Sequence, residues 1–109
     1  MTVASFRKLA LTLPDTVEGK HFHVPDFRVA GKIFATLAYE KEGFGVLLFT
    51  PEQQAGMVAD APEIFSAVPG GWGRGGSTRV HLKNVSREIL DGALKTAWRN
   101  KAPKKLLKP

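Results

Sequence analysis

Residues 25–37, PDFRVAGKIFATL, predict a β-hairpin on which the rest of the chain is arranged. Apolar and polar side chains alternate over 27–29 and again over 33–37, the period of strands that bury one face. Gly31 lies between the two segments and can adopt the positive φ that a tight turn requires. We therefore expect the hairpin to begin an antiparallel sheet.

The composition is that of one globular domain. The chain has 109 residues, of which 43% are hydrophobic and 24% are charged, values usual for a domain of this size. No apolar run approaches the roughly 20 residues needed to cross a bilayer, and the first residues lack the order of a signal peptide. Cysteine is absent, which excludes disulfides and cysteine-ligated zinc. We expect a single cytoplasmic, monomeric domain over 1–109 with a basic tail at 100–109 and no association with membranes.

Positive charge is concentrated towards the C-terminus. The net charge is +6, and residues 95–109 alone contain six Lys and Arg and no acid, so residues 1–94 are neutral as a whole. A second acid-free segment, 66–87, contains four Lys and Arg. Such a balance suits a polyanionic partner such as DNA. It equally suits a basic end that is simply solvated and aids solubility, and both interpretations stay open.

Helices are predicted at both ends and in the middle of the chain. Residues 3–13 have an apolar face, follow a good N-cap at Thr2, and end before a proline. Residues 50–53, TPEQ, have the features of a helix start with a capping box, and this short helix ends near Pro62. Residues 87–99 form the third amphipathic helix.

Further strands are predicted around the hairpin. The first covers 20–24, with Phe22 facing the core and two histidines sharing the other face. Residues 44–49 form a buried central strand, and 77–83 form a half-buried strand with a basic exposed face. The expected fold is α+β, an antiparallel sheet with the N- and C-terminal helices packed on one face. Its order is helix, three strands, helix, two strands, helix.

No pattern in the chain identifies a catalytic or metal site. The three histidines, His21, His23 and His81, could bind zinc, but without a metal-site spacing we favour surface or hydrogen-bonded histidines. Residues 70–76, GGWGRGG, lack the Lys-Ser/Thr end and the following helix of a phosphate-binding loop. We predict no catalytic residue, metal or cofactor, and hence a domain that is not an enzyme, although a triad assembled in space leaves no sequence motif.

Trp72 and Arg74 lie in this glycine-rich segment, which we expect to be a flexible loop. An exposed tryptophan beside an arginine could stack on a base while the arginine contacts phosphate. Alternatively, Trp72 folds back onto the sheet and closes the core. We favour the second interpretation because tryptophan is usually highly buried.

Candidate nucleic-acid contacts are distributed over the strands, the glycine-rich segment and the C-terminal end. They would bind phosphate and carry little sequence information. The candidates are Arg28, Lys32, Trp72, Arg74, Arg79, Lys83, Arg99, Lys104 and Lys105.

Several blocks of the chain together form a recognisable pattern. The most specific is Pro25-x-Phe27-x-Val29-x-Gly31-Lys32-x-Phe34-Ala35-x-Leu37, after Leu13-Pro14 and Glu18-Gly19. Later blocks are Thr50-Pro51-Glu52, the loop at Trp72, Val80-x-Leu82, and Trp98-Arg99 with Ala102-Pro103-Lys104. These blocks resemble the MmcQ/YjbR family of small bacterial proteins. The resemblance implies a frataxin-like (CyaY-like) α+β fold and DNA binding through a double-wing arrangement, with no established catalytic residue. The acidic iron-binding ridge of frataxins is not evident in the first helix.

Three functional classes therefore remain. The first is a module that contacts DNA through phosphates. The second is a protein-interaction or regulatory module that uses the open face of the sheet. The third is a small-ligand binder or an enzyme.

Overall fold

A computed structural model describes residues 1–107 of the chain, and Lys108 of the predicted basic tail lies outside the described residues. The elements follow one another in this order: α1 (Val3–Leu11), β1 (Thr16–His21), β2 (Val24–Val29), β3 (Lys32–Thr36), the 3₁₀ turn η1 (Glu40–Glu42), β4 (Phe44–Leu48), α2 (Pro51–Asp60), β5 (Phe65–Ala67), α3 (Gly71–Arg74), β6 (Ser77–His81), α4 (Arg87–Lys101) and α5 (Lys104–Leu107).

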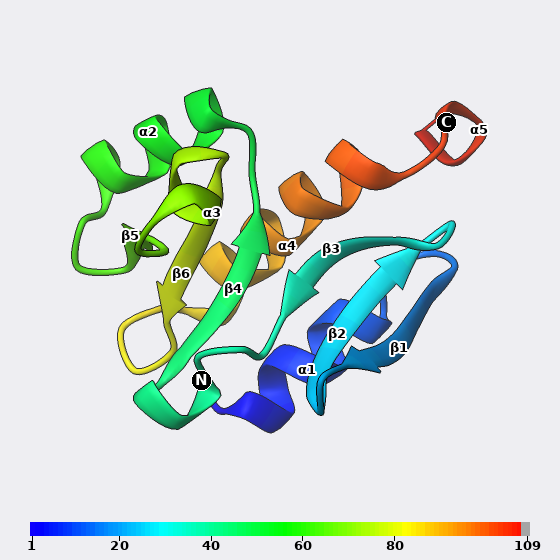
Figure 1. The fold of residues 1–109 in the computed structure, drawn as a ribbon, viewed down its shortest axis with the longest axis horizontal. Coiled ribbons are helices and arrows are strands. Elements are labelled where there is room, and N and C mark those ends of the chain that lie inside the picture. Colours follow the sequence, from blue (N-terminus) through cyan, green and yellow to red (C-terminus); the bar gives the residue numbers. More distant parts are fainter. Residues whose placement is uncertain (108–109) are drawn as a thin grey trace.

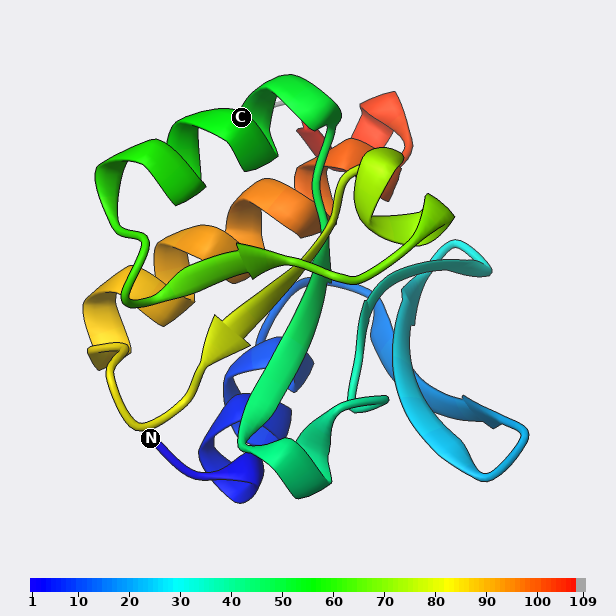
Figure 2. The same ribbon diagram turned by 60° about the vertical axis from the view of Figure 1, so that its left-hand side comes forward.

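The six strands form one antiparallel sheet in the order β1-β2-β3-β4-β6-β5. Helices α1 and α4 lie behind this sheet in Figure 1, and Figure 2 shows both on the same side of β4. The predicted α+β class, with the terminal helices on one face, is confirmed. No helix within residues 1–107 is long and apolar enough to cross a membrane.

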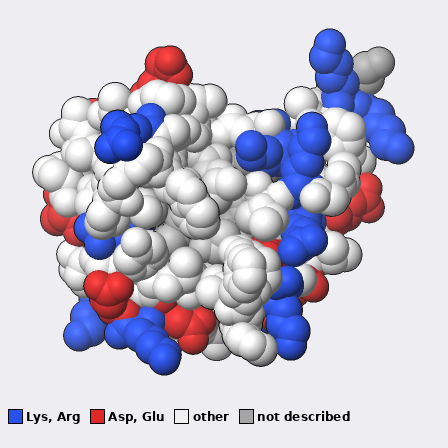
Figure 3. All heavy atoms as spheres, viewed as in Figure 1, with Lys and Arg blue, Asp and Glu red and all other residues white. Residues whose placement is uncertain are grey.

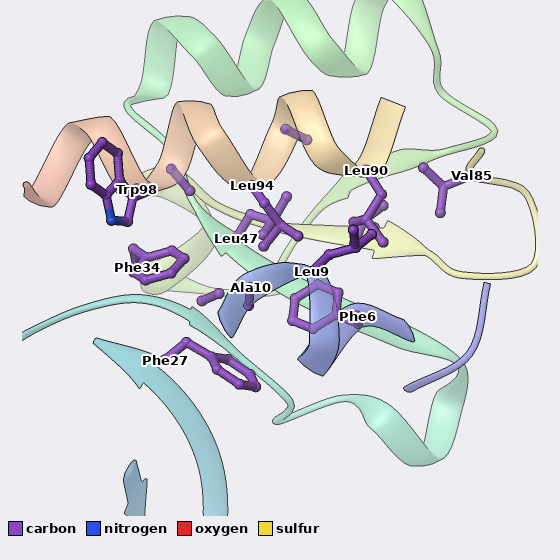
Figure 4. Close-up of a cluster of buried hydrophobic side chains, with 14 of the residues drawn as sticks. Phe6, Leu9, Ala10, Phe27, Phe34, Leu47, Val85, Leu90, Leu94 and Trp98 are labelled. Atoms are coloured by element: carbon purple, nitrogen blue, oxygen red, sulfur yellow. The ribbon is translucent and has the colours of Figure 1, made fainter. Parts of the chain in front are cut away.

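The core lies between the sheet and these two helices. Phe6 of α1 meets Phe27 of β2 edge to face, with ring centroids 6.0 Å apart. Leu90 and Leu94 of α4 are fully buried, and Figure 4 shows them with the aromatic rings in one cluster. The indole Nε1 of Trp98 donates to the carbonyl oxygen of Pro14 at 3.0 Å. This bond ties the last turn of α4 to the segment that follows α1.

The first hairpin differs from the prediction. Strand β1 covers Thr16–His21 rather than the predicted 20–24, and the chain reverses at Phe22 and His23, whose φ angles are 48° and 66°. Positive φ at both central residues is the pattern of a two-residue type I′ hairpin turn. Phe22 is therefore 94% exposed rather than in the core. Alternation did not identify β1 because it is an edge strand, which pairs its backbone with β2 but buries little side chain.

The glycine-rich segment is also not the flexible loop that we expected, because it forms the short helix α3. A Cβ at Gly73 would overlap the carbonyl oxygen of Val68, and one at Gly76 would overlap that of Phe49. Gln54 of α2 donates to the carbonyl oxygens of Gly73 and Ser77 at 2.9 and 3.0 Å. These glycines therefore permit close backbone packing. Helix α3 and a fourth strand before α2 extend the predicted order of elements.

Two glycine substitutions test this packing in opposite directions. We expect Gly45→Ala to lower the free energy of unfolding by about 1–3 kcal/mol, because the new methyl group would overlap the ring of Phe6. Gly56→Ala should raise it by about 0.5–1 kcal/mol, because Gly56 lies inside α2 with open space around its α-carbon. Urea unfolding of both variants measures the two changes. A Gly45→Ala variant at least as stable as the wild type would contradict the close packing of Phe6 on Gly45.

Candidate functional site

The face of the sheet away from α1 and α4 contains a hollow with a volume of about 430 Å³. Its floor is formed by side chains from β3 and β4, namely Ile33, Thr36, Val46 and Leu48. Thr36 and Val46 are directly paired across the two strands. Figure 3, which views this face, shows the hollow near its centre, between the lobe that contains α3 and the β2–β3 hairpin. Within residues 1–107, no Asp or Glu lines it.

Helix α3 forms one wall and presents Trp72. This side chain is 72% exposed and lines the hollow, so the prediction that it closes the core is wrong. The reason is local. Gly73 packs its α-carbon against the backbone at Val68, and neighbouring positions on a helix face different directions. With Gly73 turned inward, Trp72 is turned outward.

Lys101 contributes a positive charge to the lining of the hollow. The preceding residue, Asn100, donates from its amide nitrogen to the carbonyl oxygen of Leu48 at 3.2 Å and to Oε1 of Gln53 at 2.8 Å. These bonds hold the last turn of α4 next to β4 and α2. Within residues 1–107 Lys101 has no carboxylate partner.

A polar cluster of Asp26, Arg28 and His21 lies beside the hollow. The Asp26 side chain is fully buried, and it accepts from Arg28 Nε at 2.7 Å and from Arg28 Nη2 at 3.0 Å. Oδ2 of Asp26 also meets Nδ1 of His21 at 2.8 Å. An ionised carboxylate only accepts, so Nδ1 carries the proton and Nε2 is left for other partners. Gly19 of β1 leaves room for this cluster, because a Cβ there would lie 3.0 Å from both Arg28 Nε and Asp26 Oδ1.

The cluster changes the proton affinity of its carboxyl group. The hydrogen bonds from Arg28 lower the pKa of Asp26 below its ordinary value of 3.8, and His21 contributes in the same direction, whereas burial opposes both. The carboxylate in turn raises the pKa of Arg28. At neutral pH the pair of Asp26 and Arg28 is therefore close to neutral in total, and its arginine is held in one orientation.

Arg79 of β6 is held on the same face by aromatic rings. Its guanidinium carbon lies 4.6 Å from the ring centroid of Phe44 and 5.6 Å from that of Tyr39. Nε of Arg79 also donates to Oγ of Ser66 at 3.2 Å. Tyr39 lines the hollow, so Arg79 supports its wall as well as adding charge.

The other predicted contacts are spread more widely. Arg74 is exposed on α3, Lys32 is exposed where the β2–β3 hairpin turns, and Lys83 is exposed beyond β6. Arg99 lines a separate groove on the helical side with Leu106 and does not reach the open face. Lys104 and Lys105 are exposed on α5. Figure 3 shows Lys and Arg around the upper and right-hand margin of the hollow, over β1–β3 and the C-terminal helices, with uncharged side chains in the middle.

The three histidines are not brought together. His21 binds Asp26, His23 lies in the turn, and His81 stands edge-on to Phe44 with centroids 5.2 Å apart. Among residues 1–107 no three His, Cys, Asp or Glu side chains are grouped so that they could hold a metal ion.

Sequence reasoning did not include Lys101, His21 and Tyr39 in the site. The pairing of Asp26 with Arg28 could have been predicted, because side chains two residues apart on a strand lie on the same face. The position of Lys101 could not, because it depends on how far α4 runs beside β4.

A protein-family model described as YjbR matches residues 11–100. The chain belongs to the YjbR family. The resemblance drawn from the hairpin block is therefore confirmed. Among solved structures, this YjbR domain is similar to the crystal structure of protein DR2400 of Deinococcus radiodurans, which has a DUF419 domain. The TM-score is 0.75 at 18% identity, over 99% of this chain and 89% of that chain, which supports the fold. No curated protein matches the chain significantly.

The Asp26 cluster gives the fold a pH dependence that can be measured. In the folded protein the pKa of Asp26 lies below its ordinary value of 3.8. The ionised carboxylate therefore contributes fully to the free energy of unfolding at pH values above 3.8. This contribution is lost as the pH falls through the pKa of Asp26 in the folded protein. Asp26→Asn should therefore be less stable than the wild type at neutral pH, with a gap that narrows towards acid. Thermal unfolding from neutral pH to pH 2 measures this gap. The control is Asp60→Asn, which changes an exposed carboxylate on α2 and should be about as stable as the wild type at every pH. If the difference in stability between Asp26→Asn and the wild type were the same at every pH, the lowered pKa of Asp26 would be contradicted.

Proposed function

We propose that this YjbR domain binds single-stranded nucleic acid across the open face of the sheet. Phosphates contact the cations around the hollow, and a base stacks on Trp72. The observation that carries the proposal is the exposure of Trp72, which is 72% at the edge of a hollow without acidic lining residues.

The position of Trp72 on a packed support favours stacking. Gln54 and the close contact at Gly73 hold α3 against the sheet, so an exposed indole there loses little conformational entropy when a base covers it. Aromatic platforms of this kind contribute to binding irrespective of sequence, because every base has a π-face.

The cations around the hollow suit a flexible strand better than a regular duplex. Arg28 and Arg79 are fixed by their contacts, whereas Arg74 and Lys32 are exposed on separate elements. A single strand can follow such a curved margin and offer unpaired bases to its centre. The bases of a duplex are already stacked on each other and cannot use the indole in this way. Binding through phosphates predicts a strong dependence on salt.

A protein-interaction role is the second candidate, and Phe22 is the observation that favours it. This ring is 94% exposed at the tip of the β1–β2 hairpin, with Val17 60% exposed on β1. Capture of a stoichiometric protein partner by the nuclease-treated domain, lost on Phe22→Ser, would favour this role over nucleic-acid binding.

Substitution of the indole and of its neighbouring guanidinium separates stacking from charge. We expect Trp72→Ala to weaken binding of a labelled oligothymidine by about 1–3 kcal/mol without changing the salt dependence, because it removes a stacking contact. Arg74→Ala should reduce the slope of log affinity against log salt by about 0.7, the loss of one phosphate contact to a single strand. Fluorescence polarisation at several salt concentrations measures both.

The matched control is Lys8→Ala, since Lys8 is exposed on α1 in the helical layer. This variant should bind as the wild type does. A labelled duplex of the same length should bind more weakly than the single strand. Absence of binding to either form at low salt would reject the proposed function.

A further inference from the structure

We infer that the hollow between Trp72 and Lys101 is a site for one nucleotide, a planar heteroaromatic ring that carries a phosphate group. Such a group is offered either by a free mononucleotide or by the phosphorylated end of a strand. The second source rests on the proposed function, whereas the first does not.

The size and shape of the hollow suit a ligand of this class. Its volume of about 430 Å³ lies in the lower part of the range of small-molecule sites, about 300–1,000 Å³. The apolar floor of Ile33, Val46 and Leu48 removes a ring from water, and the indole of Trp72 can cover one of its faces. An aliphatic ligand would leave this aromatic wall unused.

Polar groups at the edge of the floor can bind the edge of a heteroaromatic ring. Oγ1 of Thr36 accepts from the backbone N–H of Ala38 at 3.3 Å, which leaves its hydrogen free to donate. Nε2 of His21 is unused by Asp26, which binds Nδ1. The hydroxyl-bearing side chains of Tyr39 and Ser77 also line the hollow. A few converging polar groups over an apolar floor are typical of small-molecule sites.

The charge of the lining selects an anion. Lys101 has no carboxylate partner within residues 1–107, and no Asp or Glu lines the hollow. Asp26, the buried acid of the cluster beside the hollow, is neutralised by Arg28. The ammonium group of Lys101 therefore meets no competing negative charge there. A phosphate is its natural partner, since lysine binds phosphate as a compact point charge.

The end of α4 is placed so that one ligand in the hollow can contact both the indole of Trp72 and the ammonium group of Lys101. Asn100 fixes the last turn against Leu48 of β4, and Leu48 is itself part of the floor. Trp72 and Lys101 come from elements far apart in the sequence, yet both line the same hollow. A nucleotide whose base covers the floor could present its phosphate to Lys101, which a bare nucleoside could not.

The experiment compares ligands that differ only in phosphate. Thermal unfolding and calorimetric titration are measured with AMP and UMP, and with adenosine and uridine as matched neutral ligands. We expect the mononucleotides to raise the melting temperature and to bind at least about tenfold more tightly than the nucleosides. Lys101→Met should remove this difference while leaving nucleoside binding unchanged. Trp72→Ala should weaken both. Lys8→Met, at an exposed position on α1 in the helical layer, should behave as the wild type does.

A second arm identifies the source of the nucleotide. Labelled oligothymidine is compared with and without a 5′-phosphate and a 3′-phosphate. If only a phosphorylated strand end shows the Lys101-dependent gain, the site takes strand ends, and if the free mononucleotides show it, the site takes a soluble ligand. If neither shows it, the inference is overturned, while oligonucleotide binding that still depends on Trp72 would leave the proposed function standing. Mononucleotide binding without oligonucleotide binding would reject the proposed function alone.

Discussion

The contact between Phe6 and Gly45 is the constraint on which the architecture depends. With no side chain on this residue of the central strand β4, the ring of α1 can lie against the backbone of the sheet. Helix α4 packs beside it, and Trp98 donates a hydrogen bond to Pro14, just after α1. Both helices are thereby committed to one face. The opposite face is left to Trp72, to Arg28 and Arg79, and to a hollow that no acidic side chain of the described residues 1–107 lines.

The open face is organised by contacts that immobilise charge. Asp26 is buried and neutralised by Arg28, and Arg79 lies on aromatic rings. In the proposed function, Arg79, which has no carboxylate partner within residues 1–107, binds phosphate at a smaller cost in side-chain entropy than a free lysine does. The exposed lysines around the margin then attract the strand from a distance.

The glycine-rich segment is packed, not flexible. Its composition taken alone indicates a flexible loop, yet Gly73 and Gly76 are needed there because each lies in close contact with neighbouring backbone. Gln54 fixes the segment from α2. A freely moving loop would give Trp72 no fixed position, whereas the packed α3 holds the backbone of Trp72 at the edge of the hollow that Lys101 also lines.

Local patterns in the sequence determined the elements that bury one face. Periodicity and capping residues were sufficient for α1, α2, α4 and the β2–β3 hairpin, because there each side chain's environment follows from its spacing along the chain. They were insufficient for the edge strand β1, because its backbone is paired while its side chains are little buried. They were also insufficient for α3 and the turn after it, because Gly73 packs against the carbonyl group of Val68 and Gly76 against that of Phe49. The hollow itself depended on tertiary structure. Its lining comes mainly from β1, β3, β4, α3 and the end of α4, and only the packing of α4 against β4 brings Lys101 to the same hollow as Trp72.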